Sequence, residues 1–403
     1  MWYNNLHVSY IPFREGGKRL SIARSLKDFF KKGDLVLLVL CLLASAFGLI
    51  LIYSATRWDS DLWDYPSRQA LFIVMGIVAY VIMTFVDIEL ILDKSWILLF
   101  LFSVVLLLML IPFGVEDDTG NRNWMYLPGL PMGIQPAEIV KVFFVLLLAR
   151  ILDRNREYGI SRPLPVVKMA LFTGFFMVLN TALSSDFGMS LVYLFIFAIM
   201  AFVAGVKLRW FALALAGGGG LIALAWSHLP NYIQMRFLVL FNHNLDPQNV
   251  GWHQTRSLLA IGSGGLTGMG FLNGKQTQSS ASSSLPARHT DFIFSVCGEE
   301  FGLIGCAVLL LLLLAIILRC VYVSRRAKDH LSAYIALGFA GMLMIQIAIN
   351  VGMCLYVAPV VGLTLPFVSY GGSSILTLFA AMGVVSGIKM RSLPSWLRDR
   401  SNL

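Results

Sequence analysis

The sequence predicts an all-α integral membrane protein with about ten transmembrane helices and a long external loop between the seventh and the eighth. Three observations predict this fold. Of the 403 residues, 58% are hydrophobic and only 13% are charged. Apolar runs of about 20 residues recur, and at 1.5 Å per helical residue that length crosses the roughly 30 Å hydrocarbon core of a bilayer. The basic residues gather in alternate connecting segments.

Ten segments have the length and composition of a membrane span. In chain order they are 34–56, 69–87, 95–114, 137–152, 164–184, 187–206, 210–228, 296–318, 332–355 and 367–388. Most connections are short and leave no room for a separate soluble domain. We expect a basic cytoplasmic N-terminal segment (1–33), a membrane domain (34–388) and a cytoplasmic C-terminal tail (389–403).

The lysines and arginines orient these spans. With the N-terminus inside, 23 of the 31 basic residues fall in cytoplasmic segments, 7 fall in external ones, and Lys141 lies within a span. This asymmetry follows the positive-inside rule, so both termini are expected in the cytoplasm. The net charge of +9 therefore reflects topology and not nucleic-acid binding. Residues 1–33 contain no apolar core, and we expect no cleavable signal peptide.

The external segment 229–295 is far longer than an ordinary connection, and such loops usually have a function or are disordered. Its glycine run, "GSGGLTGMG", lacks the G-x-G-x-x-G spacing and follows no strand, so we reject a dinucleotide site and expect no organic cofactor. Close packing of the backbone, or its approach to a phosphate, stays open. The five cysteines lie in or beside apolar spans without metal-ligand spacing, which predicts neither disulfides nor zinc.

Ionisable groups inside or at the edge of a span are costly and are therefore candidates for function. Glu138 and Lys141, in "QPAEIVKVFF", share one helical face. They form either a structural ion pair or a carboxylate that binds a metal or acceptor and is tuned by the lysine. Asp186, in "SSDFG", is either a helix N-cap or a carboxylate facing the same external cavity as Glu138.

Asp291 lies in "ARHTDFIFSVCGEEFG", where the long loop meets the eighth span. It is either an acid that caps the helix or a carboxylate, partly desolvated at the membrane interface, that acts as a general base. Glu299 and Glu300 lie deeper, and we expect one of them to pair with a cation inside the bundle.

Four ordered motifs, "QPAEIVK", "GSGGLTGMGFLNGKQ", "LPARHTDFIFSVCGEEFG" and "NVGMCLYVAPVVGLTLPFVSYGGSS", together resemble the SEDS family (shape, elongation, division and sporulation). Within it, "LNGKQ" and "RHTDFIF" are more similar to the RodA branch than to the FtsW branch. The chain departs from the family pattern at Asn123, where arginine often precedes the tryptophan, and at Arg256, where the family tends to have glutamine.

The resemblance implies a peptidoglycan glycosyltransferase that polymerises lipid II, an undecaprenyl-diphosphate-linked disaccharide-peptide, at the outer face of the cytoplasmic membrane. It also implies a class B penicillin-binding protein as the transpeptidase partner. Carried over by motif, Asp291 is the essential aspartate, and Glu138, Lys141 and Asp186 support the substrate or metal site.

In the expected mechanism, Asp291 takes the proton of an acceptor sugar hydroxyl while the donor loses its lipid diphosphate. The departing diphosphate needs positive charge. The external candidates are Arg122, Arg236, Arg256, Lys275 and Arg288. A divalent cation, Mg²⁺ or Mn²⁺, held by Glu138 and Asp186 is also expected. The alternatives are a flippase for the lipid-linked precursor, a scaffold without catalysis, and an FtsW-like division or sporulation paralogue.

Overall fold

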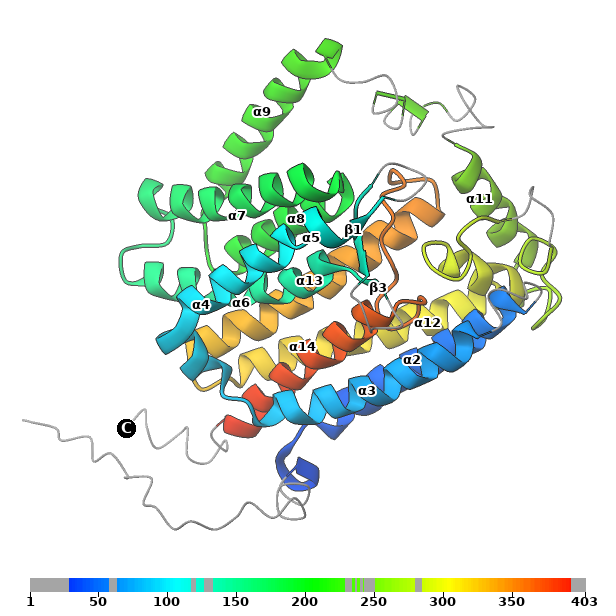
Figure 1. The fold of residues 1–403 in the computed structure, drawn as a ribbon, viewed down its shortest axis with the longest axis horizontal. Helices are drawn as coiled ribbons and strands as arrows, with labels where there is room; N and C mark the ends of the chain where they lie inside the picture. The colour runs from blue at the N-terminus through cyan, green and yellow to red at the C-terminus, as the bar shows by residue number, and fades with distance from the viewer. Residues whose placement is uncertain are drawn as a thin grey trace, which may run out of the picture.

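The computed structural model describes residues 29–57, 64–116, 121–126, 133–228, 234–235, 238–239, 242, 251–279 and 285–392 (Figure 1). The helices of the first half are α2 (Leu35–Thr56), α3 (Tyr65–Phe85), α4 (Ile88–Leu108), α5 (Leu110–Phe113), α6 (Pro136–Arg156), α7 (Pro163–Ser184) and α8 (Phe187–Val203). Those of the second half are α9 (Leu208–Ala225), the 3₁₀ turn η2 (Trp226–His228), α11 (Trp252–Gly264), α12 (Ile293–Arg325), α13 (His330–Cys354) and α14 (Gly372–Arg391).

Seven helices of this part of the chain are long and apolar enough to cross a membrane: α2, α3, α4 together with α5, α7, α12, α13 and α14. The helix α8 is apolar but shorter, at 17 residues. Two further expected spans are also helical, as α6 and α9. The protein is therefore mostly helical and crosses the membrane several times, as its composition predicts.

The core of the bundle lies around α13 and α14, the two candidate spans with the largest buried share. The most extensive packing between two of the described helices is that of α14 on α3. Small residues permit this approach, because a side chain on Gly383 would meet Tyr80 and one on Gly76 would meet Phe379. On the other side, Phe144 of α6 stacks on Phe172 of α7 at a ring-centroid distance of 5.5 Å.

The irregular backbone gathers at one end of the bundle, which we call the site end; Asp186 and Asp291 lie there, and in Figure 1 it is on the right. A small antiparallel sheet of β1 (Gly114–Val115), β2 (Trp124–Tyr126) and β3 (Gly133–Ile134) lies at this end. The segment 355–371 between α13 and α14 contains two non-glycine residues with positive φ, Tyr356 and Phe367. The last span was expected from residue 367, but its helix begins only at Gly372.

A buried ionic cluster joins three helices at the opposite end of the bundle. Asp34, the N-cap of α2, accepts hydrogen bonds from the Arg319 guanidinium at 2.9–3.1 Å, and Lys389 Nζ lies 3.3 Å from its Oδ1. Asp34 is fully buried, so these cations of α12 and α14 compensate its charge. Sequence reasoning singled out only the acids at the site end and missed this one.

Candidate active site

Asp291 lies in the turn that leads into α12, but it does not cap that helix. The N-cap is Phe292, which makes no side-chain capping bond, and the first turn of α12 contains no acid. Asp291 therefore lies one position before the cap. The simplest structural role for this carboxylate, a helix cap, does not apply.

The carboxylate of Asp291 faces the segment between α13 and α14. A side chain added at Gly362 would lie 3.8 Å from Asp291 Oδ2. Within the residues that the structure describes, no hydrogen bond or ion pair reaches this carboxylate, and the residue keeps part of its surface exposed. Burial raises the pKa of Asp291 to about 6, and the nearby Asp186 carboxylate adds to the rise. At neutral pH the group is thus mostly ionised, and it binds a proton more readily than an ordinary aspartate.

Asp186 takes one of the two roles that the sequence left open, the helix N-cap, and its place in an external cavity shared with Glu138 stays a prediction. It is the N-cap of α8, with its Oδ1 accepting from Met189 N at 2.9 Å. Asn180 of α7 donates to its main-chain carbonyl at 3.1 Å. The start of α8 also packs on the segment that Asp291 faces, because a side chain on Gly188 would meet the Val361 carbonyl. The 355–371 segment therefore brings the two aspartates to one place.

Glu138 and Lys141 form a buried ion pair in the first turns of α6. Lys141 Nζ lies 2.9 Å from both carboxylate oxygens of Glu138, and the side chains are only 1% and 3% exposed. Tyr193 of α8 donates to the carbonyl of Ala137 at 3.2 Å and ties this turn to the helix that Asp186 caps. The ion pair is thus present and buried, and a further part of Glu138 in binding a metal or acceptor stays a prediction.

The basic candidates for binding a diphosphate are placed very differently. The Arg122 side chain pairs with Glu116 at 2.8 Å, and its backbone N donates to the Ser184 carbonyl, two residues before Asp186. Arg256 lies over the Trp252 ring at 4.1 Å. Arg288 donates from Nη1 to the carbonyls of Thr277 and Ser279 at 2.7 Å. Lys275 is exposed, and Arg236 lies outside the described residues.

Glu299 and Glu300 do not pair with a cation in the described part of the chain, contrary to the sequence-based expectation. Glu299 accepts from the backbone N of Gln276 and of Thr277 at 2.7 and 2.8 Å, and from Thr277 Oγ1 at 2.6 Å. Glu300 Oε1 accepts from Ser54 Oγ and Gln278 Nε2. Backbone and side-chain donors of the loop therefore bind both oxygens of Glu299, whereas Glu300 is bound through Oε1 alone and its Oε2 has no partner in the described part of the chain.

The glycine run is a packing element. Side chains on Gly264 and Gly268 would collide with the main chain at Gly298 and Glu300, and Gly268 has φ +83°. The backbone N of Met269 and of Gly270 donate to the carbonyls of Glu299 and Glu300. Because Gly302 breaks the regular helix with φ +66°, those carbonyls are open to the loop. Of the two roles left open for this run, the structure shows close packing of the backbone.

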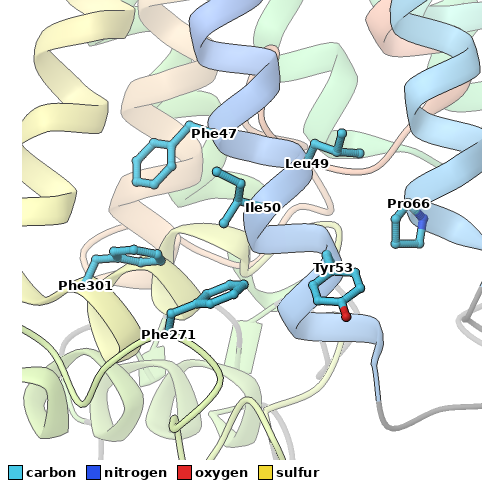
Figure 2. A pocket seen from close by; sticks show the side chains of 7 residues that line it. All are labelled: Phe47, Leu49, Ile50, Tyr53, Pro66, Phe271 and Phe301. Atoms are coloured by element: carbon cyan, nitrogen blue, oxygen red, sulfur yellow. The ribbon is translucent and has the colours of Figure 1, made fainter.

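An apolar groove of about 640 Å³ opens beside the loop between α11 and α12. Its lining comes from α2, the start of α3, the loop and α12: Phe47, Leu49, Ile50, Tyr53, Pro66, Phe271 and Phe301 (Figure 2). The ring centroids of Phe47 and Phe301 lie 5.6 Å apart, with the rings edge to face. A lining of this kind suits a hydrocarbon chain.

The described residues do not fit a metal held by the protein alone. They contain no group of three or more potential ligands, and both oxygens of Glu138 already accept from Lys141. Mg²⁺, however, is commonly bound by one or two carboxylates together with substrate phosphates. The Asp186 and Asp291 pair fits only that second arrangement, so the Glu138 and Asp186 metal site stays a prediction.

Comparison with known proteins identifies the family. Residues 34–393 match the FtsW/RodA/SpoVE family, described as "Cell cycle protein". The chain belongs to this family. It is the family that the four sequence motifs resemble, and the match covers all ten expected spans.

Relatives of this SEDS protein match almost end to end. The peptidoglycan glycosyltransferase MrdB of Escherichia coli K12 is 32% identical over 367 residues, which cover 90% of this chain and 95% of that protein. The stage V sporulation protein E of Bacillus subtilis is also 32% identical, with 89% and 97% covered. A probable peptidoglycan glycosyltransferase FtsW of Geobacter metallireducens is 31% identical, with 92% and 98% covered.

Solved structures share the fold of this SEDS protein. The rod shape determining protein RodA of Thermus thermophilus has a TM-score of 0.65 at 28% identity, covering 90% of this chain and 98% of that one. A chain from a structure described as "Structural coordination of polymerization and crosslinking by a peptidoglycan synthase complex" reaches a TM-score of 0.74 at 28% identity, with 91% and 98% covered.

Proposed function

We propose that this SEDS protein is a peptidoglycan glycosyltransferase that polymerises lipid II at the outer face of the cytoplasmic membrane. The proposal rests mainly on the state of the Asp291 carboxylate. It is partly exposed, its pKa is raised to about 6, and it has no partner among the described residues. A carboxylate in this state can accept a proton from a hydroxyl group. Relatives over nearly the whole chain are named peptidoglycan glycosyltransferases.

The proposed reaction is a displacement at the donor's anomeric carbon. The oxygen of the acceptor's 4-hydroxyl forms the new glycosidic bond, while the bond from the anomeric carbon to the diphosphate oxygen breaks. Asp291 takes the hydroxyl proton, and the undecaprenyl diphosphate leaves with the bonding electron pair. Attack opposite the leaving group turns an α-linked donor into a β-linked glycan.

The same geometry supports a position for the lipid diphosphate. The apolar groove would take the hydrocarbon chain, and the loop that contributes Phe271 to the groove also presents the exposed Lys275. Lys275 is therefore our first candidate for the diphosphate. A divalent cation carried by the diphosphate would neutralise charge on the leaving group. Asp186 and Asp291 are the carboxylates that would face it.

We propose ten membrane crossings with both termini in the cytoplasm, which puts Asp186 and Asp291 outside the cell. Supporting this, the three expected spans outside the seven candidate helices are helical as well, as α6, α8 and α9. The boundaries stay at 1–33, 34–388 and 389–403, with the 229–295 loop external. Labelling of single cysteines in that loop from outside the cell tests this topology.

For the biological role we propose RodA-like elongation together with a class B penicillin-binding protein. The motifs "LNGKQ" and "RHTDFIF" support this, as does the similarity to a chain of a peptidoglycan synthase complex. Relatives named FtsW and stage V sporulation protein E make the division and sporulation paralogues the alternative. Depletion in the native host separates them, because loss of elongation rounds the cells whereas loss of division makes them filamentous.

A gel assay of glycan polymers tests the enzyme directly. Purified protein is incubated with its partner, lipid II and moenomycin, which excludes conventional transglycosylases. We expect polymer from the wild type and from Asp64→Asn, an exposed carboxylate at the same end of the bundle, but none from Asp291→Asn. Polymer from Asp291→Asn at the wild-type rate would remove Asp291 from the base role. Headgroup translocation in liposomes without polymer would favour the flippase instead. Polymer retained after substitution of each of Glu138, Lys141, Asp186 and Asp291 would favour the scaffold.

A further inference from the structure

Three consecutive main-chain carbonyls before α12 each accept a hydrogen bond from the α13–α14 region. Tyr370 N donates to His289 O at 2.9 Å, and Ser369 Oγ donates to Thr290 O at 2.6 Å. Asn350 Nδ2 donates to Asp291 O at 2.9 Å. We call these three donors, Tyr370 N, Ser369 Oγ and Asn350 Nδ2, the carbonyl clamp. The clamp fixes the backbone from which the Asp291 side chain extends.

Asn350 joins the two sides of the place where the carboxylate lies. Its Nδ2 also donates to Leu363 O at 2.6 Å, and the neighbouring Gly362 is the residue that Asp291 Oδ2 faces. The amide of Asn350 therefore fixes the distance between the carboxylate's own backbone and the backbone opposite it. Cys354, one turn further along α13, lies with its Sγ 3.7 Å from Asp291 O.

The asparagine at this position leaves one of its own polar atoms unpaired among the described residues. Asn350 is fully buried, and its Oδ1 has no hydrogen-bond partner in the described part of the chain. Burying an unpaired amide oxygen is unfavourable. In exchange, its Nδ2 donates two hydrogen bonds, to Asp291 O and Leu363 O, and both acceptors belong to the backbone around the carboxylate.

The second side-chain donor is braced from α3. Ser369 Oγ accepts from Leu365 N at 2.8 Å while it donates to Thr290 O. Gln69 of α3 donates to the Ser369 carbonyl at 3.2 Å and accepts from Gly371 N at 3.3 Å. A chain of bonds therefore runs from a membrane helix through Ser369 to the residue next to Asp291.

We propose that Asn350, assisted by Ser369, is a positioning residue that sets where the Asp291 carboxylate lies against the acceptor hydroxyl. This inference rests on the proposed function of Asp291. Displacement of a catalytic group by about 1 Å costs on the order of 100-fold in rate. A loss of the clamp should therefore slow the chemical step while leaving substrate binding in place.

The test compares Asn350→Ala and Asn350→Leu with Gln346→Ala in the polymerisation assay, with the partner present. Leucine keeps the volume and removes the donors. Gln346 is an equally buried amide one turn earlier on α13, and it makes none of the clamp's bonds. We expect both Asn350 variants to lower kcat by roughly 10- to 100-fold with little change in KM, and Gln346→Ala to retain the wild-type values.

The pH profile separates positioning from a general loss of fold. Among the described residues, the titratable groups that interact with the Asp291 carboxyl are Asp186 at the start of α8 and Cys354 on α13. A carboxylate released from the clamp becomes better solvated, so the acid limb of kcat should move to lower pH in the Asn350 variants. A merely structural role would lower the amount of active protein without moving that limb.

Unchanged kcat in both Asn350 variants would refute the inference, and so would a lower kcat with the acid limb in place. Size-exclusion profiles in detergent show whether each variant is folded, and Ser369→Ala, expected to act in the same direction more weakly, provides an independent variant. An inactive Asp291→Asn beside fully active Asn350 variants rejects only the clamp. Activity retained by Asp291→Asn rejects the proposed function and the clamp with it.

Discussion

Lys141 Nζ lies 2.9 Å from both carboxylate oxygens of Glu138, one helical turn away on a buried face of α6. Both charges lie in the first two turns of a helix that begins at the site end, next to the turn that ties α6 to α8. Tyr193 ties this turn to α8, the helix that Asp186 caps, so a contribution of the pair to folding has to be separated from a contribution to catalysis.

Lys141→Met should lower the free energy of unfolding by about 3–5 kcal/mol, because it leaves the Glu138 charge buried without a partner. Adding Glu138→Gln should restore most of the loss. Thermal unfolding in detergent measures both, with polymerisation assayed in parallel. Recovery of stability and activity in the double variant indicates a structural pair, whereas recovery of stability alone assigns the pair a part in the site.

The rate of polymerisation should fall on the acid side with a midpoint near pH 6, because the base must be ionised and the pKa of Asp291 is raised to about 6. Asp291→Glu, tested over the same pH range, should show a lower maximal rate and a shifted midpoint. A rate that stays constant down to pH 4.5 is incompatible with Asp291 as the base.

Asp291→Asn should stabilise the fold above pH 7. The folded-state pKa of Asp291 lies above its ordinary value of 3.8, so ionisation costs stability as the pH rises through about 6, and this cost is absent below pH 3.8. The gain is at most about 3 kcal/mol at pH 8 and vanishes near pH 4. Unfolding midpoints at the two pH values check it, and equal midpoints at pH 8 would contradict the raised pKa.

Glu299→Gln should loosen the loop 274–279 more than Glu300→Gln does. Glu299 accepts three bonds from the loop through both oxygens, whereas Glu300 accepts through Oε1 and leaves Oε2 unpaired among the described residues. The substitution at Glu299 should cost about 1–3 kcal/mol, because buried charge-assisted bonds are lost. Hydrogen exchange of the backbone amides of Gln276 and Thr277 measures it, and equal protection in both variants would contradict the assignment.

Gly268→Ala and Gly262→Ala should act in opposite directions. A side chain at Gly268 would collide with the main chain of Glu300, and the φ of +83° at Gly268 is unfavourable for alanine. We therefore expect Gly268→Ala to fold poorly. Gly262 lies in α11 with no described atom within 4 Å, and alanine there should stabilise the helix by about 0.5–1 kcal/mol. Thermal unfolding in detergent measures both variants. Equal stability of the two would argue against close packing of the glycine run.

Hydropathy and charge were sufficient to predict a multi-pass helical membrane protein, because the bilayer fixes the length and composition of each span. The limits of α12 were less predictable. Its helix begins at Ile293, three residues before the expected span, and continues to Arg325. At its first end the helix packs on the loop, which donates to the carbonyls of Glu299 and Glu300, so polar residues are tolerated there. The partners of Glu299 and Glu300 could not be predicted either. Their donors are backbone amides and neutral side chains, which local sequence does not distinguish as partners.

By itself, the sequence determined that the chain lies in a membrane, that it carries the SEDS motifs, and that a few ionisable residues lie at the ends of its spans. The tertiary structure alone decided which of these charges are compensated: Glu138 pairs with Lys141, Glu299 with a loop, and Asp34 with two cations. It also decided that Asp291 faces Gly362 and lies near Asp186. The physical reason is that a charge depends on the solvation and partners supplied by distant segments, whereas hydropathy is a property of each residue in its own span.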